Sequence, residues 1–213
     1  MAKLSVDQIL VTLENQLREG KTYLAIACAL RDVEPTVSGV APTFFGLTSE
    51  GGFVMAQMCL ARLYDRPRGT VTIPLLLGEA GKNPCAFQHR SKVAEAVRYA
   101  RAKVSDIESV LAAIRHRRNT WFAHIDSEAI DDPVPHKAKA ELTIPQLQDA
   151  FHETESIIKE FENLLNGAIG PICFLGGDDY EHLFHLIREA KTRERDQFDQ
   201  AFEAQFGHAP PKS

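Results

Sequence analysis

The sequence contains no long hydrophobic run. Its longest apolar-looking stretch, residues 23–30, is far shorter than the ~20 residues that a membrane-spanning helix needs. The first eight residues also lack the basic cap and following apolar segment of a targeting signal. We therefore expect a cytoplasmic protein with no membrane partner.

The sequence also lacks close pairs of cysteines. Cys28, Cys59, Cys85 and Cys173 lie far apart, whereas zinc sites show close pairs and disulfide scaffolds are smaller and denser in cysteine. We expect Cys28 and Cys59 to be buried thiols in a reducing compartment, and neither a metal nor a cofactor. His182 and His185 are three residues apart on a predicted helix, but no matching third ligand accompanies them. A metal-dependent helical enzyme is therefore the weakest of the functional alternatives.

The charge is unevenly distributed. The 213 residues are 44% hydrophobic and 25% charged, with a net charge of −5, a composition typical of a soluble globular protein. Residues 89–118 contain eight basic and three acidic residues, so this segment carries +5 and the remainder −10. Such a positive zone can steer a polyanion to one place on a negative protein. An ordinary solvated helix face is the alternative interpretation.

Helical periodicity dominates the chain. We predict helices over 4–31, over 42–65 and over 86–102, a fourth that opens at Ser105 with a capping box, a fifth from Thr143 to Gly167, and a last one from 178 to 206. A short apolar helix is expected within 66–84. The Gly51-Gly52 pair indicates a kink or a close helix crossing. No strand pattern stands out. The predicted fold is an all-α, up-and-down helical bundle over 1–167, with an additional helical extension over 168–213.

The fourth predicted helix carries the segment Arg118-Asn119-Thr120-Trp121-Phe122-Ala123-His124. At about 100° per residue, its large apolar residues form one core-facing stripe, and these are Ile107, Leu111, Ile114, Trp121, Phe122 and Ile125. Arg118 projects from the middle of that stripe. Because a guanidinium cannot lose its charge, it must reach a carboxylate, a cleft or a partner chain. The simpler alternative is that the aliphatic part of the Arg118 side chain lies along the protein surface and its guanidinium reaches solvent.

Arg118 and His124 have side chains suited to cleaving phosphodiesters. An imidazole can transfer a proton near neutral pH, and a guanidinium can hold a phosphate through two hydrogen bonds and stabilise its developing charge. On one ideal helix the two residues point about 120° apart. A frayed helix end or a second chain is then needed to bring them together. For His124 alone, an ordinary surface position is the simpler interpretation.

Two stretches of the chain resemble the HEPN superfamily. Arg118-Asn119, four further residues and His124 match its Arg-x4–6-His motif, and the run on to Ile125-Asp126 is similar to the abortive-infection (AbiU-type) branch. The segments 41–47, with Phe44-Phe45, and 60–65, which ends in Asp65, resemble the second helix of the same branch. The resemblance covers about residues 5–165.

The resemblance implies a metal-independent endoribonuclease that acts as a toxin or antiphage effector. It implies a site composed across a homodimer, with Arg118 and His124 as the catalytic pair and Asn119 as their polar support. Asp126 and Arg117 are auxiliary residues, RNA is the substrate, and a cognate antitoxin is a candidate partner. Some relatives carry a modifiable tyrosine where this chain has Asp126, so that form of control is not expected. A non-catalytic helical module that binds nucleotide, RNA or protein is the competing interpretation, since some relatives have lost catalysis.

Overall fold

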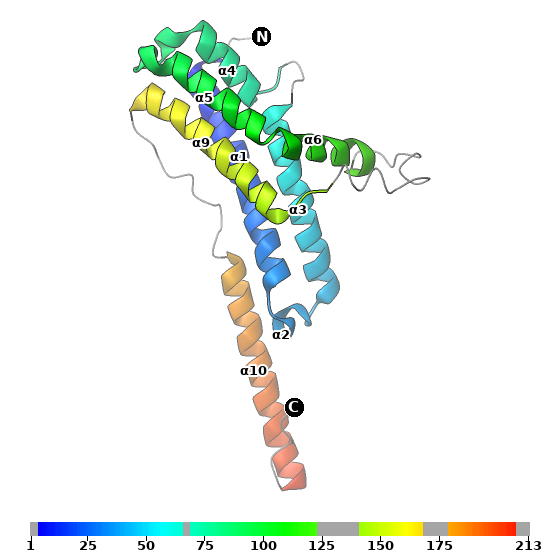
Figure 1. Cartoon of the computed structure of the whole chain (residues 1–213). Coiled ribbons are helices and arrows are strands. Elements are labelled where there is room, and N and C mark those ends of the chain that lie inside the picture. Colours follow the sequence, from blue (N-terminus) through cyan, green and yellow to red (C-terminus); the bar gives the residue numbers. More distant parts are fainter. Residues whose placement is uncertain (1–3, 66–68, 123–140, 168–178, 208–213) are drawn as a thin grey trace. The chain divides into compact units, whose positions relative to one another are not determined.

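The computed structural model describes residues 4–65, 69–122, 141–167 and 179–207, and of Trp121 and Phe122 only the backbone. Within these residues every regular element is helical, as Figure 1 shows. The elements are α1 (Val6–Asp32), α2 (Pro35–Ser38), α3 (Pro42–Tyr64), α4 (Ile73–Lys82), η1 (Pro84–Ala86), η2 (Arg90–Lys92), α5 (Val93–Asp106), α6 (Glu108–Arg117), η3 (Arg118–Phe122), α9 (Ile144–Asn166) and α10 (Asp179–Phe206). The predicted all-α fold is therefore confirmed. None of the described helices is both long enough and apolar enough to cross a membrane.

The chain divides into two compact units, and two helices contribute to both. The first unit comprises 1–24 and 53–175, and the second comprises 25–52 and 176–213. The boundaries fall inside α1 and α3, so each of these helices begins in one unit and ends in the other. The predicted division into a bundle over 1–167 and an extension over 168–213 stays a prediction.

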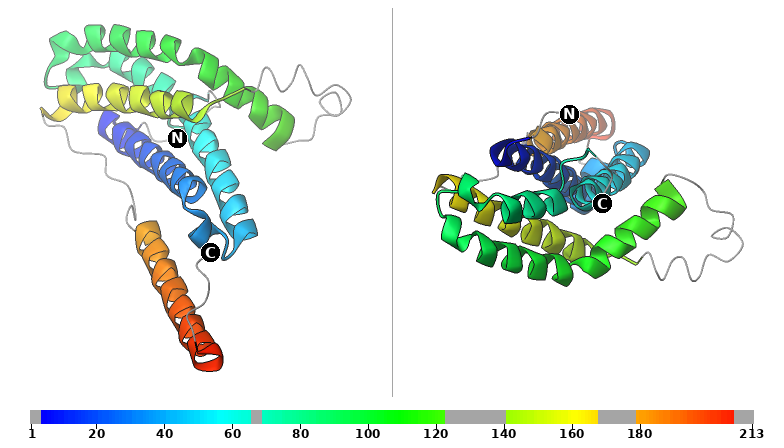
Figure 2. Two further views of the ribbon diagram at one scale, coloured as in Figure 1. Left: turned by 60° about the horizontal axis from the view of Figure 1, so that its bottom comes forward. Right: turned by 90° about the horizontal axis from the view of Figure 1, so that it is seen from above.

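The first unit is organised around α5 and α9, which lie side by side in both views of Figure 2 and pack against each other. The amphipathic helix α9 buries eight residues along one face, with Phe151 and Phe161 almost completely enclosed. Thr143 and Gln146 form a reciprocal capping box at its start, and Gly167 ends it in the left-handed conformation with φ +67°. This start and stop agree with the sequence prediction, because both depend on local backbone donors and acceptors.

Three helices of the first unit meet closely at Gly20 of α1. A Cβ atom built at this position would lie 2.7 Å from a ring carbon of Phe151 and 2.9 Å from Cβ of Cys59. Glycine therefore allows α1, α3 and α9 to approach one another more closely than alanine would. Gly51, by contrast, would place a Cβ in open space, and α3 runs without interruption through it. The close crossing is at Gly20 and not at Gly51.

The second unit has a small apolar core of its own. Leu30, Val37, Phe45 and Phe184 are buried together, from the end of α1, α2, the start of α3 and α10 respectively. The Ser49 hydroxyl donates a hydrogen bond of 2.9 Å to the Ala27 carbonyl, which ties α3 to α1. Arg188 of α10 binds both carboxylate oxygens of Glu34, the residue that precedes α2. These contacts hold the first half of α10 onto the unit.

Two local predictions are wrong. The helix predicted from residue 86 begins at Val93, because two short 3-10 turns occupy part of the preceding segment. The capping box predicted at Ser105 does not form. Ser105 lies in the last turn of α5, and the next helix starts at Glu108 with Ile107 as a cap that offers no side-chain hydrogen bond. Backbone donors around Ser105 are used by α5 itself, so nothing there needs a side-chain acceptor.

Candidate active site

The motif begins at the junction between α6 and η3. The helix α6 forms on the apolar residues predicted for its core-facing stripe, and Ile107, Leu111 and Ile114 are all buried. Arg117 is its last residue and Arg118 follows as its C-cap. The buried stripe therefore fixes the azimuth at which the two arginines leave the helix.

From Arg118 to Phe122 the backbone is a π-helix rather than an α-helix. In a π-turn each bond spans five residues instead of four, and such turns are frequent at functional sites. The interpretation of 107–125 as one regular helix is thus wrong at residues 118–122. The predicted 120° separation between Arg118 and His124 loses its basis, because it assumed a constant 100° per residue.

Arg118 reaches a carboxylate. Its Nη1 donates to Oδ2 of Asp65 in a salt bridge, and its Nε donates to the side-chain oxygen of the adjacent Asn119 at 3.3 Å. The Arg118 and Asp65 side chains keep 26% and 25% of their surface exposed. A guanidinium has five N–H donors, and these two contacts use two of them. Arg118 is therefore both held in place and open to a further anion.

Arg117 makes a contact with α3. Its Nη1 donates to Oε1 of Gln57 at 3.1 Å, while Nε2 of Gln57 donates to the Phe53 carbonyl one turn earlier in α3. Gln57 is buried, and its hydrogen bond within α3 holds the amide in the orientation that accepts from Arg117. Burial lowers the pKa of Arg117, although a guanidinium stays charged at any physiological pH. The motif is thus anchored at two points, Gln57 within α3 and Asp65 directly after its last residue.

A buried hydrogen bond positions Asp65 in turn. The Tyr64 hydroxyl lies 2.8 Å from Oγ1 of Thr154 in α9, and Thr154 donates its own proton to the Ala150 carbonyl at 2.7 Å. Tyr64 must therefore be the donor to Thr154. Burial raises the pKa of Tyr64, with the hydrogen bond to Thr154 acting against it, so the phenol stays protonated. A chain of contacts leads from α9 through Tyr64 and Asp65 to Arg118.

The structure brings together only part of the predicted site. Arg118 and Asn119 are adjacent and hydrogen-bonded, with Asn119 exposed and Arg117 half-buried beside them. His124 and Asp126 lie outside the described residues. Sequence reasoning missed the roles of Asp65 and Gln57. The one signal for Asp65 was the requirement that Arg118 find a carboxylate, cleft or partner, and sequence alone does not choose among these.

No cluster of three metal-ligating side chains occurs among the residues that the structure describes. His185 there pairs with Glu189 of the same helix at 3.3 Å. Of the predicted buried thiols, Cys59 is buried and Cys28 is half-buried, and both are free. Burial raises the pKa of Cys59 to about 11, which fits a structural rather than a reactive thiol.

Comparison with known protein families decides the identity at the family level. A HEPN family model described as AbiU2 matches residues 4–192. The chain belongs to the HEPN AbiU2 family. The resemblance drawn from residues 5–165 is confirmed, and the match extends further, into the first half of α10. No curated protein and no solved structure matches the chain.

Proposed function

We propose that this HEPN AbiU2 protein is a metal-independent endoribonuclease whose catalytic pair is Arg118 and His124. Asn119 supports the pair, with Arg117 and Asp126 as auxiliary residues. The site is completed across a homodimer, and the enzyme acts in the cytoplasm as a toxin or abortive-infection effector against cellular or invading RNA. A cognate antitoxin would restrain it.

The observation that carries the proposal is the state of Arg118. In a chain of the HEPN AbiU2 family, the motif arginine stands at the start of a π-turn, held from one side by Asp65 and still part-exposed. A guanidinium fixed in this way can bind a phosphate through its remaining donors without first losing side-chain freedom. Its fixed charge then stabilises the charge that develops on the phosphate during cleavage.

His124 supplies the proton transfer that Arg118 cannot. An arginine keeps its protons, so a base must take the proton of the attacking 2′-hydroxyl and an acid must protonate the leaving oxygen. An imidazole can do either near neutral pH. No metal is required for this chemistry, because Arg118 supplies the positive charge.

The test compares the purified chain with Arg118→Ala and His124→Ala on several RNAs in the presence of EDTA. We expect the parent chain to cleave and each variant to lose about 100-fold or more of the rate, as removal of an acid–base or charge-stabilising group typically does. Arg18→Ala is the matched control. Arg18 pairs with Glu14 at 2.6 Å, with exposed side-chain fractions of 26% and 24%, close to those of Arg118 and Asp65. Intact RNA with the parent chain would overturn the proposal.

A non-catalytic binding module is the second candidate, and the Arg118–Asp65 salt bridge favours it. An arginine that has a carboxylate partner needs no substrate to explain it. On this interpretation Arg118→Ala alters folding or partner binding, the parent chain cleaves no RNA, and His124→Ala relieves no growth inhibition when the protein is produced in cells. The same variants therefore separate the two candidates.

A further inference from the structure

Arg117 is a half-buried cation without a carboxylate partner. Seven lysines and arginines among the described residues are half-buried. Six of them form salt bridges with Asp or Glu, and these six are Arg18, Lys21, Lys103, Arg115, Arg118 and Lys159. The seventh is Arg117, which within the described part of the chain contacts only the neutral amide of Gln57. A partly desolvated charge is costly unless an opposite charge compensates it, so this position points to an anion from outside the chain.

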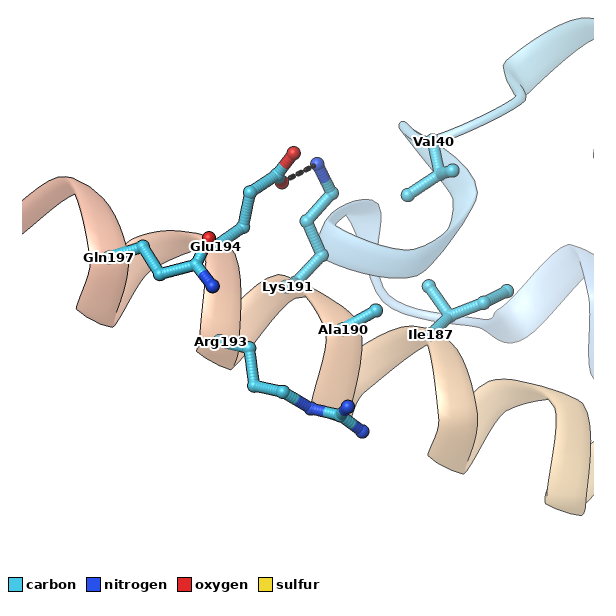
Figure 3. A pocket seen from close by; sticks show the side chains of 7 residues that line it. All are labelled: Val40, Ile187, Ala190, Lys191, Arg193, Glu194 and Gln197. Atoms are coloured by element: carbon cyan, nitrogen blue, oxygen red, sulfur yellow. Dashed lines mark hydrogen bonds and ion pairs between the residues drawn. The ribbon is translucent and has the colours of Figure 1, made fainter.

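The cations of the second unit offer a contrast. A cavity of about 420 Å³ there is lined by Lys191 and Arg193, as Figure 3 shows. Lys191 pairs with Glu194 at 2.7 Å, and Arg193 pairs with Glu189 at 3.1 Å. Both cations are exposed and already compensated within α10. An anion that entered this cavity would have to displace a carboxylate, whereas an anion that reached Arg117 would not.

Gln57 holds the Arg117 side chain in place without neutralising it. Nη1 of Arg117 donates to Oε1 of Gln57 at 3.1 Å, and within the described residues this is the hydrogen bond that the guanidinium makes. A guanidinium has five N–H donors, so four remain for another acceptor. The carbonyl end of α6 adds only a partial negative charge and accepts from none of these four. Arg117 is therefore oriented, charged and open to an anion.

Arg117 and Arg118 are held at different points along α3. Their partners, Gln57 and Asp65, are eight residues apart, and Asp65 continues the helical hydrogen bonding through its N–H to the Ala61 carbonyl. At 1.5 Å per residue this separation is about 12 Å along the helix axis. A phosphate accepts charged hydrogen bonds at about 2.7–2.9 Å. One phosphate therefore cannot bind both guanidinium groups in these positions.

We propose that Arg117 binds a second phosphate of the RNA, separate from the one at Arg118. The inference rests on the proposed function, because it takes the phosphate at Arg118 as the one that is cleaved. A nucleic-acid strand fits two cations fixed at different points along one helix, since its phosphates recur at regular intervals. The substrate is then a strand that continues beyond the cleaved bond. A dinucleotide, which has one phosphate between its nucleosides, engages Arg118 but not Arg117.

The first test measures the binding of 2′-O-methyl RNA strands of increasing length, beginning with the dinucleotide. These strands cannot be cleaved, because the attacking hydroxyl is blocked. Arg117→Gln should bind the dinucleotide as the parent does. It should lose about tenfold or more of the affinity that the parent gains on longer strands, as the loss of a charged hydrogen bond typically does. Arg115→Gln is the control, because Arg115 lies in the same last turn of α6 but is paired with Glu108.

The salt dependence of binding is the second readout. On the longest strand, the slope of log K against the logarithm of the salt concentration should be smaller by about 0.7 in Arg117→Gln, which corresponds to one phosphate contact. Gln57→Glu supplies the missing carboxylate while it keeps Arg117, so it should lower the affinity and the slope in the same way. Urea unfolding checks that each variant is folded, and Arg117→Gln decides alone if Gln57→Glu is not.

A parent-like length dependence and slope in Arg117→Gln would overturn the inference. An equal loss of affinity for the dinucleotide would do so too, because it would show that Arg117 only positions Arg118. A parent chain that binds no strand of any length also refutes it. If the parent shows the expected length dependence but cleaves no RNA, the ribonuclease proposal fails and the second phosphate site stands.

Discussion

Asp65 controls the position of the motif arginine. Its salt bridge joins residues 53 apart in sequence, and with about a quarter of each side chain exposed it contributes at most about 1 kcal/mol to folding stability. Its larger effect is to hold the guanidinium in one orientation.

If Arg118 acts in RNA cleavage as proposed, Asp65→Asn should lower the rate of cleavage more than the stability of the fold. We expect at least about a tenfold loss of rate, as a misplaced catalytic group shows, with the free energy of unfolding changed by less than about 1 kcal/mol. The measurements are single-turnover cleavage and urea unfolding. Glu14→Gln, which removes the partner of Arg18, should change neither the rate nor the products. A rate that is unchanged in Asp65→Asn would show that Arg118 needs no such support.

The sequence could predict that Arg118 needs a counter-charge, but it could not name Asp65. Two independent facts were required: that α3 ends at Tyr64, and that α9 holds this end through Thr154. Each arises from packing between distant segments. The π-turn could not be predicted either. Nothing in the composition of residues 118–122 indicates that their backbone hydrogen bonds span five residues instead of four.

At the scale of the helices, the close crossing at Gly20 reverses the usual effect of a glycine-to-alanine substitution on folding stability. In an open helix, glycine to alanine stabilises by about 1 kcal/mol. At Gly20 the added Cβ would overlap the buried ring of Phe151 and the Cys59 side chain, and forced overpacking costs about 1–3 kcal/mol.

We expect Gly20→Ala to destabilise the protein by about 1–2 kcal/mol and Gly51→Ala to stabilise it by about 0.5–1 kcal/mol. Gly51 is a suitable control because it is also inside a long helix and a Cβ there meets nothing within 4 Å. Thermal and urea unfolding of the two variants give the comparison. The same sign for both would show that α1 does not approach α3 and α9 as closely as described.

The attachment of α10 to α2 depends on pH through Glu34. The hydrogen bond from Arg188 lowers the pKa of Glu34 from 4.5 to about 2. A carboxyl whose pKa is lower in the folded state contributes stability above its unfolded pKa, and this is lost as the pH falls through the folded value. The contribution is therefore complete above about pH 4.5 and disappears towards pH 2.

Glu34→Gln should unfold at a lower urea concentration than the parent at pH 7, and the difference should vanish between pH 4.5 and pH 2. The effect is small because the pair is exposed to solvent. Glu189→Gln, which removes the charge that pairs with Arg193 and His185 inside α10, should show a smaller difference at pH 7. A difference for Glu34→Gln that persists at pH 2 would contradict the assignment to this salt bridge.

At the scale of the molecule, the positive segment 89–118 presents much of its charge to solvent. Arg90, Lys92, Arg98 and Arg101 are all exposed on η2 and α5, whereas Lys103 is paired with Glu153 at 2.8 Å. If the substrate is RNA, these four exposed cations form a second contact surface in addition to the motif. Each phosphate contact on a single strand contributes about 0.7 to the slope with which log K for RNA binding falls as the logarithm of the salt concentration rises.

Replacing Arg98 and Arg101 together by alanine should weaken RNA binding at all sequences and lower that salt dependence by about 1.4. Fluorescence titrations from 50 to 200 mM salt measure it. The control replaces Arg18 and Arg31, which lie in α1 outside the positive segment, and should leave the slope unchanged. Equal slopes for all three proteins would indicate that α5 does not contact the RNA.

Helix content and helix order could be predicted from the sequence because apolar periodicity and caps are local signals. The start of α9 at Thr143 and its end at Gly167 are examples. The grouping of residues 25–52 with α10 in one compact unit was not predictable, since it depends on which apolar faces meet. Leu30, Val37, Phe45 and Phe184 come from four elements, and nothing in the spacing of these residues joins them.

The π-turn after Arg118 can also be understood as an insertion. A helix that gains one residue within a turn keeps its direction on both sides, but everything that follows is rotated by about 100° relative to what precedes it. A motif that tolerates four to six residues between its arginine and histidine is one that tolerates such insertions and deletions. Inserting or deleting one residue after Arg118 therefore leaves the contact between Arg118 and Asp65 unchanged. It rotates the residues that follow, and so changes the direction in which their side chains point.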